Sequence, residues 1–307
     1  FPTRRSSDLE MPNETTVLQP LIERAQERLE PQTLYVVATP IGNLSDITLH
    51  ALAVLSKADV VCAEDTRDTG QLLAAYGIKA KLISVREQNE QTMAVKVIEA
   101  LAAGQIVAQV SDAGSPAVCD PGARLVAQVR AAGYKVSPVV GASAVIAALS
   151  VAGITAPDFV FAGFIPSKPS ERRTLLNAWQ NIHQTIVSYE TPHRIEATLA
   201  DMHTVFPERV VMLAREITKT FETFLIGTPS ELQAALTQDS NQSRGEMVLI
   251  VHPLEKVQED TISSEAAQLL SLLLDDMPLK KACDIVHRTF SANKKHLYDL
   301  GLTLKSK

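Results

Sequence analysis

Short apolar runs alternate with longer stretches of helical periodicity between residues 34 and 152. β-Branched and aliphatic residues fill the runs, and apolar residues recur three and four positions apart in the stretches between them. This alternation is typical of a parallel sheet covered by helices, so residues 33–154 predict one doubly wound α/β domain. The predicted strands are 34–39, 59–64, 81–85, 105–111 and 135–140, with predicted helices at 48–57, 67–76, 90–103, 121–132 and 142–152.

After a short linker at 155–158, the order of predicted strands and helices changes. Two apolar runs at 210–214 and 220–226 lie too close together for a helical crossover, which predicts an antiparallel pair. Residues 155–253 therefore predict a second domain of mixed α/β type. Its expected strands are 159–164, 185–189, 210–214, 220–226 and 247–252, and its expected helices are 170–181, 192–203 and 228–237.

The two ends of the chain have weaker patterns. Residues 1–32 are mostly polar, and we expect them to be a leader outside the fold, in which 1–10 are either an adapter-derived remnant or a disordered stretch before Met11. Residues 260–307 predict three helices, at 262–275, 278–289 and 293–302. One apolar stripe in this segment consists of Leu279, Ala282, Ile285, Val286 and Phe290. The segment is either a helical cap buried on the second domain or an appendage that contacts RNA, and the polar linker before it favours the appendage.

Composition and charge narrow the class of protein. The chain has 307 residues, of which 46% are hydrophobic and 21% charged, as in ordinary globular proteins. Its richest apolar stretch, 136–154, is broken by Pro, Gly and Ser, which argues against a membrane span. The formal net charge is −6, but seven Lys or Arg against two Asp between 277 and 307 give that segment +5 and leave −11 for the rest. The last thirty residues are therefore a basic appendage.

The three cysteines, Cys62, Cys119 and Cys283, lie far apart without a neighbouring His cluster. This spacing supports neither a disulfide framework nor a zinc site, so we expect a cytoplasmic protein without a metal. The glycine-rich dinucleotide and P-loop motifs are missing, as are the zinc-protease spacing and the serine-nucleophile elbow.

Turn-forming loops follow four predicted strands, at 39–43, 64–67, 111–116 and 141–144. Open α/β sheets bind ligands at the carboxyl ends of their strands, where these loops would meet. Taken singly, each loop could be only a turn. Taken together, they gather small residues and the carboxylates of Glu64, Asp65 and Asp112 at one edge, which predicts a ligand site.

Seven segments in order carry a family resemblance. They are 34–47, 63–70, 110–116, 120–122, 188–194, 214–220 and 244–250, including Thr-Pro-Ile-Gly-Asn, Ala-Glu-Asp-Thr-Arg and Ser-Asp-Ala-Gly-Ser-Pro. These segments resemble the ribosomal small-subunit RNA 2′-O-methyltransferase I family of the tetrapyrrole methylase superfamily. One departure lies at 140–144, where Val-Gly-Ala-Ser-Ala lacks the two prolines that many members have, so this loop is expected to be less stiff.

The resemblance implies a two-domain methyltransferase that binds S-adenosylmethionine in a cleft between its domains. It further implies methylation of the ribose 2′-hydroxyl of a cytidine in the decoding region of small-subunit ribosomal RNA, by a homodimer without metal or membrane. In-line methyl transfer requires mainly orientation and a polar, partly closed cleft, which agrees with the lack of metal-ligand spacing.

The resemblance also suggests roles for particular residues. On the cofactor side it places Ser111, Asp112, Ala113, Gly114, Ser115, Pro116, Gly141, Ala142, Ser143, Ala144, Tyr189, Ala214, Gly245, Glu246 and Met247. On the RNA side it places Thr39, Pro40, Gly42, Asn43, Arg67, Lys168, Arg172, Arg173 and Arg215. Deprotonation of the hydroxyl needs a base or a cation, and the open candidates are Glu64, Asp65, Glu216 and Lys219. Glu64 and Glu216 could instead form structural ion pairs with Arg67 and Arg215.

Two other functions stay open. A tetrapyrrole or diphthine methyltransferase would share the cofactor site, and a non-catalytic ribosome-binding relative would keep only the fold. The basic loop at 168–173 and the basic C-terminal segment favour RNA over a small anionic substrate.

Overall fold

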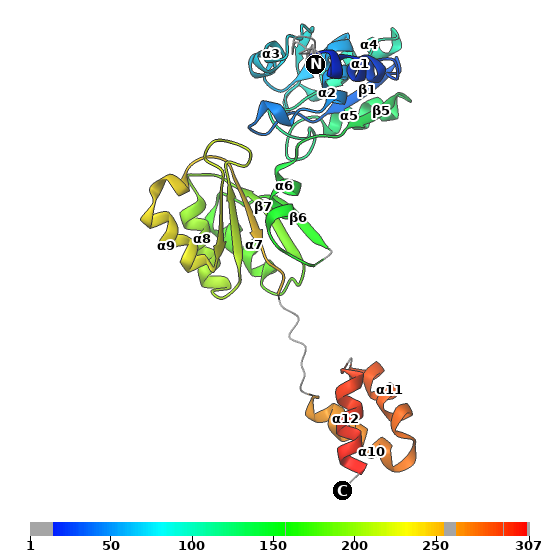
Figure 1. Cartoon of the computed structure of the whole chain (residues 1–307), viewed down its shortest axis with the longest axis vertical. Coiled ribbons are helices and arrows are strands. Elements are labelled where there is room, and N and C mark those ends of the chain that lie inside the picture. The colour runs from blue at the N-terminus through cyan, green and yellow to red at the C-terminus, as the bar shows by residue number, and fades with distance from the viewer. Residues whose placement is uncertain (1–14, 157, 255–261, 291, 306–307) are drawn as a thin grey trace, which may run out of the picture. The chain divides into compact units, whose positions relative to one another are not determined.

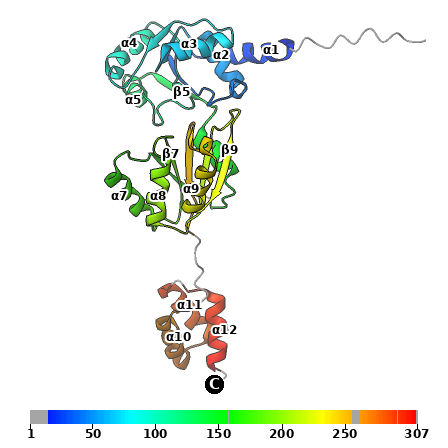
Figure 2. The same ribbon diagram turned by 90° about the vertical axis from the view of Figure 1, so that its left-hand side faces the viewer.

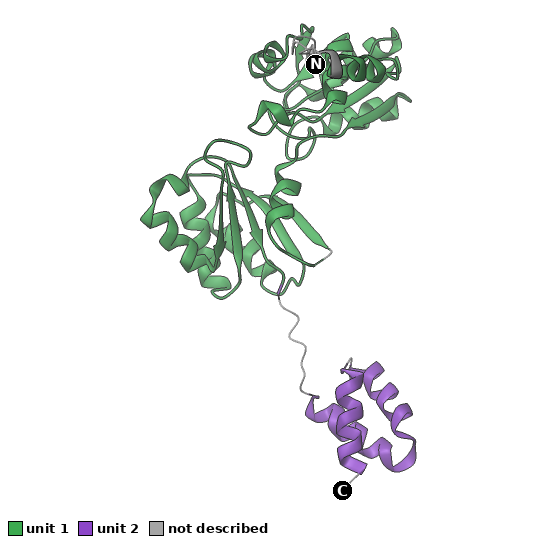
Figure 3. Cartoon of the chain, viewed as in Figure 1, with its two compact units in different colours: residues 1–253 green, residues 254–307 purple. Residues whose placement is uncertain are grey.

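The computed structural model describes residues 15–156, 158–254, 262–290 and 292–305. The chain divides into two compact units, residues 1–253 and 254–307 (Figure 3). The first unit contains two five-stranded sheets, and the second is helical (Figure 1).

The first sheet is fully parallel, with the strand order β3-β2-β4-β1-β5. Alternate residues of its strands point to opposite faces, as strand geometry requires. On β1, Tyr35 and Val37 join the core under α2 and α3, whereas Leu34 joins the core under α4 and α5. The doubly wound prediction is therefore confirmed. The strands are β1 (Thr33–Val37), β2 (Val60–Ala63), β3 (Leu82–Ser84), β4 (Val107–Gln109) and β5 (Lys135–Val139), and the helices are α2 (Leu49–Lys57), α3 (Thr66–Ala75), α4 (Glu90–Ala102) and α5 (Ala123–Ala131).

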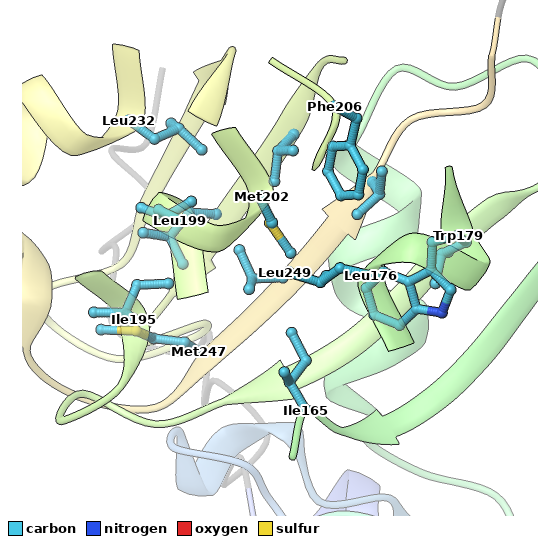
Figure 4. Packing of buried hydrophobic residues seen from close by; sticks show 14 of the residues in the cluster. Ile165, Leu176, Trp179, Ile195, Leu199, Met202, Phe206, Leu232, Met247 and Leu249 are labelled. Carbon is cyan, nitrogen blue, oxygen red and sulfur yellow. The ribbon is translucent and has the colours of Figure 1, made fainter. Parts of the chain in front are cut away.

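The second sheet is mixed, with the order β6-β7-β10-β8-β9. Only β6 and β7 run parallel, and β8 and β9 form the predicted antiparallel pair. Three helices, α7, α8 and α9, cover one face and enclose a core around Leu199 and Leu249 (Figures 1 and 4). The strands are β6 (Phe159–Phe164), β7 (Thr185–Glu190), β8 (Val211–Arg215), β9 (Thr223–Gly227) and β10 (Met247–Val251), and the helices are α7 (Pro169–Trp179), α8 (Ile195–Val205) and α9 (Pro229–Gln238).

Helix α6 (Ala144–Val151) covers the other face of the second sheet. Val145 and Ala148 pack there with Met212 and Val248. The sequence pattern predicts this helix as part of the first domain, but its packing partners are strands of the second. Because α6 is apolar on most of its surface, its pattern predicts a helix without indicating which sheet it covers.

Residues 15–32 belong to the first unit, contrary to the expectation of a leader outside the fold. Helix α1 (Thr15–Gln26) contacts α2, and the Gln26 amide donates to Ser56 Oγ at 2.8 Å. After the helix, Leu29 packs on the core and the Glu30 amide donates to Tyr35 Oη at 2.9 Å. The many polar residues and Pro20 conceal the helix in the sequence. Residues 1–14, including Met11, lie outside the described residues.

The second unit is a three-helix bundle of α10 (Ser264–Asp276), α11 (Leu279–Phe290) and α12 (Lys294–Lys305) (Figure 2). The predicted stripe on α11 is buried in part, because Ala282 and Val286 are enclosed whereas Phe290 is 41% exposed. Its partners include Leu270 of α10 and Leu297 of α12. The bundle thus has a hydrophobic core of its own.

Candidate active site

A pocket of about 480 Å³ lies in the first unit, with lining residues from both sheets. Eight of the predicted cofactor residues line it: Ala113, Gly114, Ser115, Ser143, Ala144, Tyr189, Glu246 and Met247. The other seven, Ser111, Asp112, Pro116, Gly141, Ala142, Ala214 and Gly245, do not. The remaining lining residues are not among the predicted site residues and include Ile41, Val118, Cys119, Asp120, Phe161, Phe164, Glu190, Thr191, Pro192, Ile217 and Val248.

The loops after β1 and β4 are joined backbone to backbone beside this pocket. The Thr39 amide donates to the Gly114 carbonyl at 2.8 Å, and the Gly114 amide donates back at 3.0 Å. Gly114 has a φ of +73°, and a β-carbon there would lie 3.4 Å from Ile41 Cγ2. A side chain at this position would therefore be strained and would point toward a lining residue.

Several predicted cofactor residues hold the pocket wall without lining it. Ser111 is buried and donates to the Ala113 carbonyl at 3.1 Å, while Asp112 accepts from the Asp65 amide at 3.0 Å. The loop at 140–144, which lacks both prolines, accepts hydrogen bonds from Thr48 at Val140 O and from Ser115 at Ala142 O. These contacts position the neighbouring backbone.

The segment 117–122 contributes three of the lining residues that were not predicted, Val118, Cys119 and Asp120. Ala117 and Cys119 have φ values of +66° and +65°, which non-glycine residues rarely adopt. The segment is fixed by Glu90, a buried residue of α4 whose carboxylate accepts from the amides of Gly122 at 3.0 Å and Leu125 at 2.8 Å. Strained backbone of this kind concentrates at functional sites. The Asp-Pro-Gly motif at 120–122 was the available signal, but it had no role assigned.

Three carboxylates interact at the edge where β2 and β4 end. Burial raises the pKa of Asp120, and the nearby Asp112 adds to the rise while a bond with Ser111 opposes it. Burial also raises the pKa of Glu64, with Asp112 and Asp120 contributing. In contrast, hydrogen bonds with Arg67 lower the pKa of Asp65. Among these acids, Asp120 lines the pocket itself.

The second sheet contributes rings and one buried acid. The Tyr189 ring lies 5.1 Å from the Phe161 ring and 5.2 Å from the Phe164 ring, centroid to centroid. Burial raises the pKa of Tyr189 to about 12, with Cys119 and Asp120 contributing. The Glu190 carboxylate accepts from Thr198 Oγ1 at 2.6 Å and pairs with Arg194 at 2.8 Å, so it is already satisfied by the protein.

Lys219 joins two acids beside the pocket. Its Nζ lies 3.0 Å from Glu216 Oε1 and 3.0 Å from Glu246 Oε2. Burial pushes the pKa of Glu216 upward, but the Glu246 amide and Lys219 bring it below its usual value. Burial alone would lower the pKa of Lys219, and its two acidic partners raise it. A β-carbon at Gly42 would collide with the Lys219 side chain, so glycine lets the loop after β1 approach closely.

The part of the chain that the structure describes does not contain the ion pairs Glu64–Arg67 and Glu216–Arg215 that were considered as alternatives to a catalytic role. Arg67 pairs with Asp65 at 3.2 Å, not with Glu64, and Glu216 pairs with Lys219, not with Arg215. Of the four proton-transfer candidates, Asp65, Glu216 and Lys219 are therefore paired with opposite charges.

Several residues predicted to contact RNA are buried. Arg172 is 5% exposed and donates to Asp201 at 2.7 Å, and Arg215 is 6% exposed and donates to the Arg244 carbonyl at 3.1 Å. Thr39 and Pro40 are also buried. A buried arginine whose donors are satisfied inside the protein has a structural role, and RNA contact by these residues stays a prediction.

The predicted basic loop at 168–173 is also not a loop, since α7 begins at Pro169. The sequence shows that residues 168–173 are basic, but it does not show which of their side chains are buried. The predicted RNA-side residues that stay on the surface are Gly42, Asn43, Arg67, Lys168 and Arg173.

Within the described ranges, no group of three His, Cys, Asp or Glu side chains could hold a metal ion. No described helix combines the length and apolar character needed to cross a bilayer.

Comparison with known proteins gives two family matches. Residues 33–233 match the model of the tetrapyrrole (corrin/porphyrin) methylases, and residues 260–305 match that of the RsmI C-terminal HTH domain. The chain is 57% identical over 291 residues to ribosomal RNA small subunit methyltransferase I of Neisseria meningitidis serogroup B, covering 95% of this chain and 100% of that protein. It is 45% identical over 270 residues to the protein of the same name from Pasteurella multocida, covering 88% of this chain and 96% of that one.

Solved structures share the fold at low identity. The uroporphyrin-III C-methyltransferase of Thermus thermophilus is 22% identical with a TM-score of 0.52, over 72% of this chain and 94% of that one. A diphthine synthase is 13% identical with a TM-score of 0.56, over 72% of this chain and 89% of that one.

Proposed function

The chain belongs to the ribosomal RNA small subunit methyltransferase I family and is an S-adenosylmethionine-dependent ribosomal RNA methyltransferase. We propose that its target is the ribose 2′-hydroxyl of a cytidine in the decoding region of small-subunit ribosomal RNA. The observation that carries this proposal is the match over nearly the whole chain to relatives of that name, together with a pocket built from the motif loops of both sheets.

The pocket suits this cofactor in size and chemistry. Its volume of about 480 Å³ is that of a small-molecule site. The carboxylate of Asp120 and the rings of Tyr189 and Phe161 suit a ligand that carries a positive charge and a flat base. Gly114 also lines the pocket, and its positive φ suits glycine. When bound, the cofactor supplies a methyl group on a sulfonium.

The chain's own residues then orient the hydroxyl and handle its proton. Of the four candidates, Glu64 has a raised pKa and no ion-pair partner among the described residues, so we assign it as proton acceptor. Lys219 stays protonated between its two acids and would stabilise a developing oxyanion. We expect Glu64→Gln to lower the methylation rate about a hundredfold or more while leaving affinity for S-adenosylhomocysteine unchanged. Lost cofactor affinity would argue against this role.

On the RNA side, we retain the surface residues Gly42, Asn43, Arg67, Lys168 and Arg173 as contacts. The Arg67 side chain is 84% exposed and lies at the start of α3, three positions after Glu64 in the chain. A cation at this position would bind a phosphate close to the proposed proton acceptor.

Mass mapping of ribosomal RNA tests the target. Small subunits from cells that lack this protein are incubated with the enzyme and S-adenosylmethionine, and the RNA is digested and sequenced by mass. The expected product is one added methyl group on the ribose of a cytidine in the decoding region. A methyl group on a base, or at a distant nucleotide, would contradict the proposal.

Each of the two alternative functions has its own test. Uroporphyrinogen or a diphthine precursor offered in place of subunits would be methylated by an enzyme of the first kind. For a non-catalytic relative, S-adenosylhomocysteine would not raise the melting temperature, whereas an intact site predicts stabilisation by ligand linkage.

The homodimer and the cytoplasmic location are further parts of this proposal. Exposed apolar residues at the edge strand β6 support a second copy as partner, because Phe159 is 45% and Val160 is 38% exposed. Light scattering on the purified protein would give twice the 33.3 kDa chain mass for a dimer.

A further inference from the structure

The charges of the C-terminal unit are divided between its helices. Helix α10 carries Glu265, Asp275 and Asp276 and no Lys or Arg. Helices α11 and α12 carry six Lys or Arg and two Asp: Lys280, Lys281, Arg288, Lys294, Lys295, Lys305, Asp284 and Asp299. The basic character predicted for the segment therefore resides on two of its three helices.

These cations form one surface across α11 and the start of α12. The Lys294 ammonium of α12 lies 2.7 Å from the Asp284 carboxylate of α11. Asp284 also interacts with Lys280 and Arg288, which lie one turn before and after it, and together these cations lower its pKa. One acid is thus surrounded by three cations from two helices.

An exposed aromatic residue extends this surface. Tyr298 lies one helical turn after Lys294, on the same side of α12, and is 44% exposed. The inward face of α11 and α12 is already occupied by the core around Val286 and Leu297. The basic face is therefore free of the packing that holds the bundle together.

We propose that the face formed by Lys280, Arg288, Lys294, Lys295 and Tyr298 binds the RNA of the small ribosomal subunit. Lysine and arginine contact the phosphates and position the enzyme, and Tyr298 stacks on an unpaired base. The geometry supports this partner because α11 and α12 are separated by three residues, as in a helix-turn-helix, and their outer charge is complementary to a polyanion. This inference rests on the proposed function for the identity of the RNA.

The test uses the full-length protein and a triple variant, Lys280→Gln, Arg288→Gln and Lys295→Gln, which keeps the Lys294–Asp284 pair. Affinity for small subunits is measured over a salt series. The slope of log affinity against log salt concentration, called the salt slope, is expected to be smaller in magnitude by about 2 to 3 for the triple variant than for the wild type. The affinity of the triple variant for small subunits is expected to be roughly tenfold lower or more. Tyr298→Leu is expected to weaken binding about five- to hundredfold without changing the salt slope.

Two control variants keep the interpretation specific. Neutralising the exposed lysines Lys57, Lys79 and Lys96 of the first unit removes the same charge. Replacing Glu265, Asp275 and Asp276 of α10 by their amides tests the acidic helix of the bundle. Both controls are expected to keep a salt slope at or above that of the wild type. An equal loss in the Lys57, Lys79 and Lys96 variant would overturn the proposal, because it would show an effect of net charge alone.

Two further measurements separate the remaining outcomes. If the triple variant loses affinity for intact subunits but not for protein-free ribosomal RNA, the face binds a ribosomal protein and the proposal is wrong. If the wild type does not methylate a ribose but the salt slope still depends on these residues, the proposed function fails while the surface assignment holds. Unchanged affinity for S-adenosylhomocysteine in the triple variant shows that the first unit is intact.

Discussion

The first sheet reaches the pocket through its loops, whereas the second sheet reaches it mainly through its strands. Gly114 and Asp120 lie on the connection after β4, but Tyr189, Met247 and Val248 are strand residues of β7 and β10. We call the part of the pocket lined by loops of the first sheet the loop wall, and the part lined by strands of the second sheet the strand wall. The shape of the loop wall depends on backbone conformation, while the shape of the strand wall depends on the hydrophobic core behind the strands. Substitutions near the first sheet should therefore act on cofactor binding, and those in the second domain should act on stability.

The largest effect on stability is expected for Arg172→Ala in the second domain. Arg172 and Arg173 donate to the same carboxylate of Asp201, but their side chains are 6% and 63% exposed. Removing the buried partner should lower the free energy of unfolding by about 3–5 kcal/mol. Arg173→Ala is the matched control, with an expected loss below about 1 kcal/mol.

Urea denaturation measures both variants. If the folded Arg172→Ala protein lost affinity for subunits while its stability stayed near that of the wild type, the residue would act on RNA after all. The comparison between a loop wall and a strand wall would then fail.

Gly114→Val is expected to act mainly on the cofactor. Valine at a φ of +73° costs about 1–2 kcal/mol of stability, and its side chain would also point toward Ile41 in the pocket wall. Calorimetry with S-adenosylhomocysteine should show a loss of at least about tenfold in affinity, equivalent to about 1.4 kcal/mol. Gly104→Val provides the control, because Gly104 has a φ of +85° and open space around it. A similar affinity loss in both variants would show that the effect is global destabilisation.

Glu90→Gln tests whether a distant helix fixes the loop wall. The amide keeps an acceptor for Gly122 and Leu125 but removes the charge from two hydrogen bonds, with an expected cost of about 1–2 kcal/mol. Because these bonds hold the segment that carries Asp120, cofactor affinity should fall by more than stability alone explains. Full affinity in a protein that is still fully folded would contradict this positioning role.

Asp120→Asn should produce the smallest change in stability, and in the opposite direction. The pKa of Asp120 is raised in the folded protein, so the folded state binds the proton more tightly than the unfolded state does. Stability then falls as the pH rises from the ordinary value of 3.8 through the raised pKa. Removing the acid should therefore slightly raise the melting temperature at neutral pH but not below pH 3.8, while weakening cofactor binding. A lower melting temperature at neutral pH would contradict this assignment.

The extent of prediction from sequence differed between backbone and side chains. All ten strands were expected within a few residues, because short β-branched runs bounded by turns identify them locally. The burial of Arg172 and Arg215 was not predicted, because the sequence does not distinguish an exposed arginine from a buried one with hydrogen-bond partners inside the protein. Segment 117–122 was missed as pocket lining for a related reason, because its fixing residue Glu90 lies some thirty positions away.

Local patterns therefore determined the described strands, the helices after α1, the parallel first sheet, the antiparallel pair β8–β9, the motif loops and the basic character of the C-terminal segment. Only the tertiary structure decided that α6 covers the second sheet, that α1 belongs to the first unit, and that Asp120 faces the pocket. The physical reason is that periodicity records which residues of an element are buried but not what buries them. The residues that bury an element, and the partners of its ion pairs, are often far away in the sequence. Only folding brings these residues into contact.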